Sequence, residues 1–176
     1  MNATQTVEIR RLRPHEAGDA VDAVFAGMSD ESRRLRFHLP ITRLPAYFRQ
    51  ELVRLDGHTR AAVVARVDDT PVGVGRIAAL SATQAEVAVA IVDEWHGHGI
   101  GRKLLSAAAD LAADIGYREL VADVLAENTA MLKVLDSVFP GSRRERRSGV
   151  IRVVVTLNAD AAGADALLEP ALAFAS

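Results

Sequence analysis

The sequence predicts one α+β domain, layered as in α/β proteins, in which a mixed central β-sheet is flanked by helices. Of its 176 residues, 49% are hydrophobic and 25% are charged, which is enough apolar side chain to bury a core. Short segments in which apolar and polar residues alternate, as is typical of strands, occur among segments whose apolar residues have helical spacing. Their order along the chain, β-α-α-α-β-β-β-α-β-α-β-β, suits a sheet covered by helices.

The N-terminal third of the chain predicts one strand and three helices. Alternation in TVEIRRLR indicates the strand, and Pro14 ends it. Apolar residues at helical spacing indicate the helices, the second of which is capped by Ser29 or Asp30. The expected ranges are 6–13 for the strand and 15–29, 31–37 and 44–55 for the helices.

The rest of the chain predicts an antiparallel meander followed by a second set of helices and strands. Three Ala- and Val-rich strands are separated by turns at residues 68–71 and 82–84. Gly116 ends the clearest helix, Asn128 caps the next one, and Ser148 and Gly149 indicate a hairpin. The expected strands are 60–67, 72–80, 86–92, 120–125, 143–147 and 150–157, and the expected helices are 100–115 and 129–139. Residues 1–157 form the expected domain, and the Ala-rich residues 158–176 are a tail or one loosely docked helix.

Composition excludes several classes of function. The chain has 21 Lys and Arg, 23 Asp and Glu and a formal charge of −2, so we expect no nucleic-acid partner. With no cysteine, thiolate catalysis and Cys-based metal sites are excluded, and the His spacing predicts no catalytic metal. No signal pattern and no apolar run of about 18 residues occurs, so we expect a cytoplasmic monomer or homodimer without a membrane partner.

The segment AEVAVAIVDEWHGHGIG, residues 85–101, carries the strongest functional signal. A strand runs into Gly97, Gly99 and Gly101, which open directly into the best helix. Glycines let the backbone curl so that several N–H groups point at one anion, and the helix N-terminus adds a partial positive charge. The segment therefore predicts a phosphate or pyrophosphate cradle, to which Arg102 adds charge.

Other kinds of glycine-rich segment fit the spacing less well. A dinucleotide fold uses GxGxxG near the chain start, whereas the spacing here is GxGxG, and a Walker loop needs GK[ST]. A plain strand–helix turn needs only one or two glycines. Gly73 and Gly75 open no helix, so we expect them at a bulge or a close packing contact.

The glycine segment resembles motif A of the GCN5-related N-acetyltransferases (GNAT), in which a strand, [QR]xxGx[GA] and an amphipathic helix follow one another. Here the motif reads HGHGIG, with His96 in place of Gln or Arg. The strand 120–125 and the helix after Asn128 are similar to the next elements of that family. The phrase MSDESRRLRF, residues 28–37, is similar to SxESxxxRF in bacterial Pat-type protein-lysine acetyltransferases. The resemblance extends from Val7 to Leu157.

This resemblance implies the GNAT fold and an N-acetyltransferase. Acetyl-CoA would be the co-substrate, with no metal, and the acceptor would be a small-molecule amine or a protein lysine that attacks directly in a ternary complex. Many members carry a tyrosine as general acid seven residues after the asparagine, where this chain has Leu135. The implied cofactor-binding residues are Val89, Ala90 and Ile91 for the pantetheine arm and acetyl carbonyl, Gly97, His98, Gly99, Ile100, Gly101 and Arg102 for the pyrophosphate, and Asn128 near the pantetheine or sulfur.

Acetyl transfer to an amine needs a base, because an alkylamine with a pKa of about 10.4 is mostly protonated at neutral pH. Glu86 is the first candidate, since residues 86, 88 and 90 share one strand face and the two alanines leave room beside it. Asp123, in the middle of an apolar strand, is the second.

Two further questions stay open in the sequence. Arg33, Arg34 and Arg36 either select an acidic substrate or form a solvated helix face. A non-catalytic acyl-CoA-binding sensor, or a nucleotide-binding module of another fold, remains an alternative to the enzyme.

Overall fold

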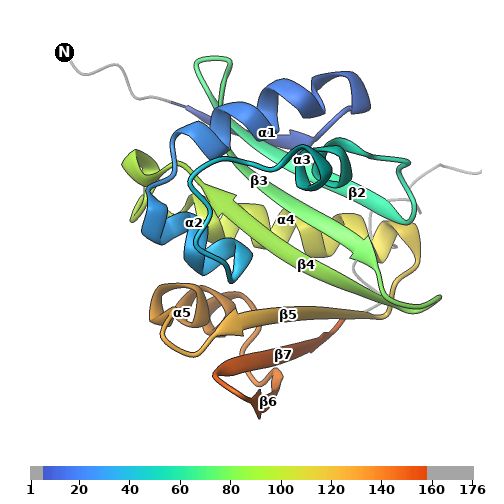
Figure 1. Cartoon of the computed structure of the whole chain (residues 1–176). Coiled ribbons are helices and arrows are strands. Elements are labelled where there is room, and N and C mark those ends of the chain that lie inside the picture. Colours follow the sequence, from blue (N-terminus) through green and yellow to red (C-terminus); the bar gives the residue numbers. More distant parts are fainter. Residues whose placement is uncertain (1–5, 158–176) are drawn as a thin grey trace, which may run out of the picture.

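The computed structural model describes residues 6–157, which form a seven-stranded sheet in the order β1-β2-β3-β4-β5-β7-β6 (Figure 1). The predicted tail or helix at 158–176 lies outside the described residues. The strands are β1 (Val7–Arg11), β2 (Arg60–Val67), β3 (Thr70–Ala79), β4 (Gln84–Ile91), β5 (Glu119–Leu125), β6 (Arg143–Arg147) and β7 (Val150–Thr156). The helices are α1 (Ala17–Ala26), α2 (Asp30–Phe37), α3 (Ala46–Val53), α4 (Ile100–Ile115) and α5 (Thr129–Val138), with short 3-10 turns η1 (Pro14–Glu16) and η2 (Asp93–Trp95).

The predicted order of strands and helices is confirmed, and the differences lie at element ends. The helix expected over 15–29 is shorter, because Pro14 begins a 3-10 turn and Gly27 ends α1. Ser29 leaves that helix to cap α2, and its Oγ accepts the Ser32 N–H at 3.2 Å. The turn expected over four residues needs only two, Asp68 and Asp69, which both take positive φ angles.

Helices cover both faces of the sheet (Figure 1). On one face α4 packs against β1 to β4, and on the other α1 packs against β3 and β4. A Cβ on Gly73 would lie 2.8 Å from Leu104 Cδ1, and one on Gly75 would lie 3.2 Å from Leu104 O. The two glycines thus let α4 approach β3 closely, which confirms the packing role expected for them.

A split in the sheet positions the site. β4 and β5 are the one parallel pair among the described strands, and their pairing covers only Gln84–Glu86 against Glu119–Val121. Beyond Glu86 the two strands diverge, toward the side where α2 and α5 lie (Figure 1). A gap therefore opens in the middle of the sheet, between β4 and β5. Along this gap a ligand can reach the backbone groups of β4 that pair with no strand.

Candidate active site

The open edge of β4 carries backbone groups that no strand pairs. The bonds Leu80 N–H to Gln84 O and Val92 N–H to Val72 O show that even-numbered residues of β4 bond to β3. The N–H and C=O groups of odd-numbered residues therefore point toward the split. The ring Nε2 of His96 lies 3.2 Å from Ile91 O and occupies that oxygen.

This register refines the three backbone positions predicted for the pantetheine arm. Val89 directs its N–H and C=O toward the split. Val87, which the sequence pattern did not single out, lies at the last rung of the β4–β5 pairing, so its N–H faces Val121 and only its C=O is open. Ala90 directs its backbone groups toward β3 and contributes its side chain to the cavity. Strand alternation alone could not separate these positions, because it does not reveal which edge of β4 is unpaired.

The glycine loop presents a row of free amides. Gly97 and Gly99 have φ angles of 78° and 76°, in the left-handed region where other residues are strained. No described group accepts a hydrogen bond from the amides of residues 97 to 102. Gly99 is the N-cap of α4, so the partial positive charge of that 16-residue helix falls on the same place. These donors fit a diphosphate group.

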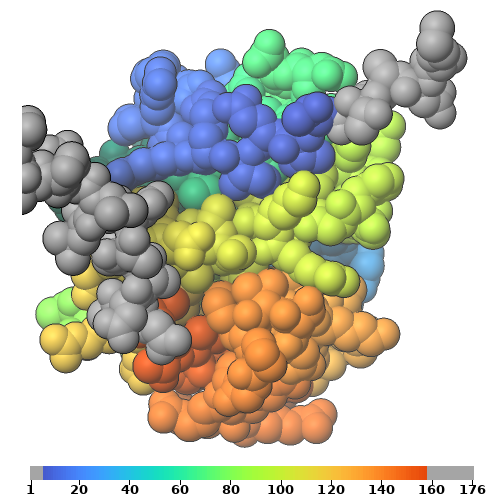
Figure 2. Space-filling view, turned by 180° about the vertical axis from the view of Figure 1, so that it is seen from behind, coloured from blue at the N-terminus to red at the C-terminus, as the bar shows by residue number. Residues whose placement is uncertain are grey.

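The remaining glycine of the motif has a different role. A Cβ on Gly101 would lie 3.3 Å from Ile91 Cδ1 and 3.8 Å from Val134 Cγ2. Gly101 therefore lets the first turn of α4 sit close to the end of β4 and to α5. Seen from behind, this yellow-green part of the chain lies beside the orange of α5 (Figure 2).

A cavity of about 820 Å³ joins the split to the glycine loop. Its walls come from α2, α3, β3, β4, β5, the β4–α4 loop, the first turn of α4 and α5. Because Val121 pairs with Glu86, Asp123 lies on the same sheet face as Glu86, across the split. The structure thus brings both predicted carboxylates into one cavity with nearly all the predicted cofactor residues. The predicted residues that line it are Glu86, Val89, Ala90, Ile91, Gly97, Gly99, Ile100, Gly101, Arg102, Asp123 and Asn128.

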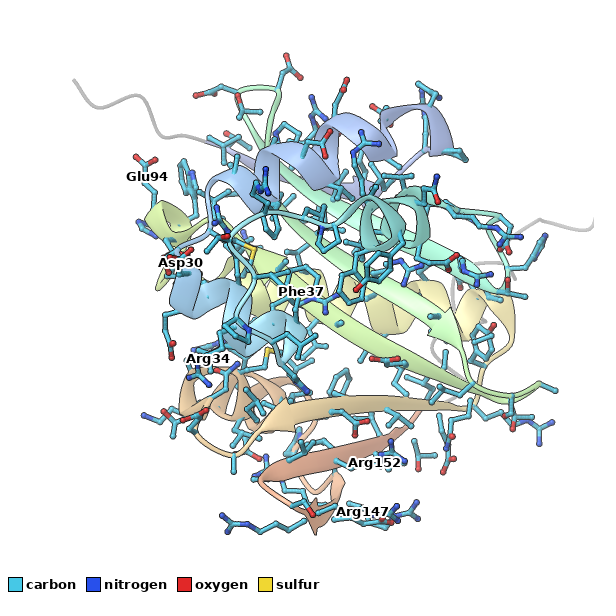
Figure 3. All side chains as sticks on the ribbon, in the orientation of Figure 1. Asp30, Arg34, Phe37, Glu94, Arg147 and Arg152 are labelled. Atoms are coloured by element: carbon cyan, nitrogen blue, oxygen red, sulfur yellow. The ribbon has the colours of Figure 1, made fainter. Side chains whose placement is uncertain are left out.

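The two carboxylates differ in their partners. Both oxygens of Asp123 accept from Arg152, which lies directly opposite on β7, at 2.8 Å and 2.7 Å (Figure 3). This hydrogen bonding lowers the pKa of Asp123 from its ordinary value. Glu86 is exposed and makes no hydrogen bond or ion pair with a described residue.

His98 and the asparagine have local roles. The Nδ1 of His98 lies 2.9 Å from His96 O, and its ring meets Trp95 edge-on, so the loop's side chains hold one another. Asn128 lines the cavity while its Oδ1 caps α5 by accepting the Met131 N–H at 3.1 Å. Leu135 is fully buried, so no acid group stands where the family's tyrosine would be.

The arginines of α2 separate into two kinds. Arg33 donates to Phe25 O and Thr42 O, and Arg34 pairs with Glu31 and Glu127, as expected of a structural or solvated face. Arg36 instead lines the cavity, stacked 5.0 Å from the Phe37 ring centroid. Burial lowers the pKa of Arg36 to about 10.

Arg76 of β3 is a site residue that the sequence pattern did not reveal. Its side chain lines the same cavity, and its Nη2 donates to Glu51 O at 2.5 Å. The available signal was a single charged residue inside the apolar strand VGVGRIAA. Such a position indicates either a solvated face or a site, and only the placement of α2 and α3 over that face decides between them.

Residues 6–157 contain neither a cluster of candidate metal ligands nor a helix that could span a membrane. These residues hold no group of three or more His, Cys, Asp or Glu side chains suited to a metal ion. No helix among them combines the length and apolar character that a membrane span requires.

Comparison with known proteins places the chain in a family. A family model described as "Acetyltransferase (GNAT) family" matches residues 26–138. A search of curated protein sequences finds no match. Among solved structures, the GNAT domain of S. lividans PAT is 26% identical, with a TM-score of 0.78, and the match covers 86% of this chain and 90% of that one.

Two further structures share the fold. A cAMP-binding acyltransferase from Mycobacterium smegmatis is 25% identical, with a TM-score of 0.58, covering 86% of this chain and 44% of that one. Spermidine N-acetyltransferase from Vibrio cholerae, solved with CoA and spermine, is 16% identical, with a TM-score of 0.64, covering 86% and 95%. Since the family model spans the split strands, the glycine loop and both carboxylates, the chain belongs to the GNAT family of acetyltransferases.

Proposed function

We propose that the chain transfers the acetyl group of acetyl-CoA to a primary amine by direct attack in a ternary complex, with Glu86 as general base. One observation carries this proposal. A carboxylate without a partner stands where β4 and β5 separate, in a cavity that continues to the unpaired amides of the glycine loop. Base and cofactor cradle thus share one open space.

The residues present fit the cofactor. The amides of residues 97 to 102 and the side chain of Arg102 would hold the diphosphate, and the open N–H and C=O of Val89 with the C=O of Val87 would hold the pantetheine arm. Asn128 lies across the cavity from β4 and would contact the same arm. When bound, acetyl-CoA supplies the thioester that the amine attacks.

The role of Glu86 in this reaction is to accept a proton from the substrate amine. An alkylamine with a pKa of about 10.4 reaches the site mostly as the ammonium ion, which cannot attack. Because no described residue donates a hydrogen bond to the Glu86 carboxylate, it can accept that proton directly or through one water molecule. The open N–H groups of β4 supply donors for the oxygen on which negative charge develops during acyl transfer.

Asp123 is less suited to the same task. Arg152 occupies both of its oxygens, and a lowered pKa makes it a weaker base. We therefore assign Asp123 to holding β5 and β7 in register. Leu135 offers no proton to the departing thiolate, which can leave as the anion because a thiol pKa is about 8.5.

Replacement of the base tests this function. Glu86→Gln should lower kcat/KM for amine acetylation at least ~100-fold, the usual size of a general-base contribution, and should leave the Kd for CoA unchanged. The kcat/KM is measured as thiol release over a panel of amines and lysine peptides, and the Kd for CoA by isothermal titration. Glu94→Gln, the same change at an exposed residue outside the cavity, is the matched control.

Two results would contradict the proposal. Near wild-type turnover of Glu86→Gln would remove the role from this residue. Wild-type protein that binds acetyl-CoA yet releases no thiol with any acceptor would instead support the alternative, a non-catalytic acyl-CoA-binding sensor.

A further inference from the structure

Arg36 stands apart from the other arginines of its helix. Arg33 and Arg34 each have oxygen partners, whereas Arg36 makes no hydrogen bond and no ion pair with any described residue. Its Nε is buried without a partner. Figure 3 shows Arg34 at the lower end of α2, beside α5. Phe37, the residue that follows Arg36, lies over the sheet. Burying a guanidinium without a partner costs free energy, so a ligand group that pairs with it gains that energy on binding.

Arg76 repeats this arrangement from the floor of the cavity. It lies opposite Ala88 on β4, which makes it a diagonal neighbour of Glu86, about 7–8 Å away between backbones. Its Nε is also buried without a partner. Its one described bond is to a neutral carbonyl, Glu51 O, so its charge is not balanced by that contact.

The acidic residues nearby offset the charge of these two arginines only in part. Glu51 pairs with Arg60 at 3.1 Å. Glu86 is close enough to attract both guanidiniums, but no described hydrogen bond or ion pair joins its carboxylate to either one. This part of the cavity therefore carries two guanidiniums against one carboxylate, which leaves an excess of positive charge. An acceptor with several ammonium groups would meet unfavourable charge there, whereas one with an ammonium and an oxyanion would match both signs.

We infer that the acetyl acceptor is a small zwitterion, a primary amine that also carries a carboxylate or a similar oxyanion. Arg36, with Arg76, binds the oxyanion, while the amine faces Glu86. The inference rests on the proposed function and names its substrate class. The cavity of about 820 Å³ also has to hold part of acetyl-CoA, so the space left for the acceptor suits a small molecule, and partly buried guanidiniums are more accessible to a small molecule than to a folded protein surface.

The test compares each amino acid with its carboxamide, which has nearly the same shape but no negative charge. Thiol release from acetyl-CoA is measured with the L-amino acids, β-alanine and γ-aminobutyrate, and with the carboxamide of each. At least one acid should react with a kcat/KM at least ~10-fold above that of its carboxamide, about 1.4 kcal/mol of discrimination. This readout uses the wild-type protein alone, so it does not depend on a variant that folds.

The variants assign the discrimination to Arg36. Arg36→Gln should raise KM for the preferred acid at least ~10-fold, change KM for its carboxamide less than about twofold, and leave KM for acetyl-CoA unchanged. Arg36→Lys keeps the charge and should restore part of the acid preference. Arg34→Gln is the matched control, because it removes the same charge from the same helix outside the cavity.

The outcomes separate this inference from the proposed function. Equal reaction of acids and carboxamides, acid preference that survives in Arg36→Gln, or acetylation of lysine peptides alone would overturn the zwitterion assignment and leave the acetyltransferase in place. Wild-type protein that releases no thiol with any acceptor would overturn both.

Discussion

Glu86 and Asp123 look alike as residues of apolar strands, and their surroundings make them different. The sequence offers both as candidate bases, and in the structure both line one cavity. The partner of Asp123, Arg152, lies 29 residues further along the chain. No local pattern shows that pairing, so the sequence could name two candidate bases and could not rank them by their partners.

Asp123→Asn should leave catalysis nearly intact. The asparagine is close in size and can still accept from Arg152, and Asp123 transfers no proton in the proposed reaction. We expect kcat/KM for amine acetylation within about fivefold of wild type, against a loss of at least ~100-fold for Glu86→Gln. Steady-state thiol release measures both variants side by side. The reverse ranking would make Asp123 the base.

The same ion pair makes fold stability depend on pH. Arg152 lowers the pKa of Asp123 below its ordinary value of 3.8, so the folded state binds that proton less readily than the unfolded state. The pair therefore stabilises the fold above pH 3.8, and this stabilisation is lost as pH falls through the lower folded pKa. Thermal unfolding is measured for wild type and Asp123→Asn at about pH 7 and about pH 3. The difference in Tm between the two proteins should be smaller at the lower pH. A Tm difference that is larger at about pH 3 than at about pH 7 would contradict the assigned pairing.

At the scale of elements, β4, the glycine loop and α4 act as one unit. Gly97 and Gly99 take left-handed φ angles, and a Cβ added at either would meet no atom within 4 Å, so their requirement is one of backbone conformation and not of space. This kind of requirement is readable from sequence, since glycines at alternate positions where a helix begins are typical of an anion-binding turn. The unpaired edge of β4 is not readable, because it depends on where β5 diverges.

Gly99→Ala should weaken CoA binding. A residue other than glycine at a φ of 76° costs about 1–2 kcal/mol, and relaxation of that strain would turn the amides of the loop away from a common point. We expect the Kd for CoA to rise about 5- to 20-fold in isothermal titration. Gly116→Ala is the control, because Gly116 is also left-handed, at φ 112°, but ends the far side of α4. Equal effects of the two substitutions on Kd would mean that the loop does not hold the cofactor.

The helix α2 shows where element-level reasoning stops. The spacing of Arg33, Arg34 and Arg36 predicts three directions around the helix axis, but it does not predict which direction meets the sheet. That is set by the contacts of α2 with β4 and β5 and by the aromatic contacts of Phe37 with Phe25 and Phe48. From the sequence, any of the three arginines could select an acidic substrate. In the structure only Arg36 of the three lines the cavity.

At the scale of the whole molecule, the fold class and the order of elements follow from periodicity and turn residues. These signals are local, and each strand or helix carries its own. The strand order β5-β7-β6 and the parallel contact of β4 with β5 are long-range facts, which hydrophobic pattern alone does not fix. The site arises from those facts: one short parallel contact, ended at Glu86, opens the sheet beside the loop and places the base at the fork.

Hydrogen exchange of backbone amides tests the central claim most directly. The amides of residues 97 to 102 have no described acceptor, so they should exchange rapidly in the free protein. Saturating CoA should slow their exchange at least ~10-fold, and leave the amides of β6 unchanged. CoA that binds, as judged by titration, while these loop amides continue to exchange at their free rate would contradict the claim that they hold its diphosphate.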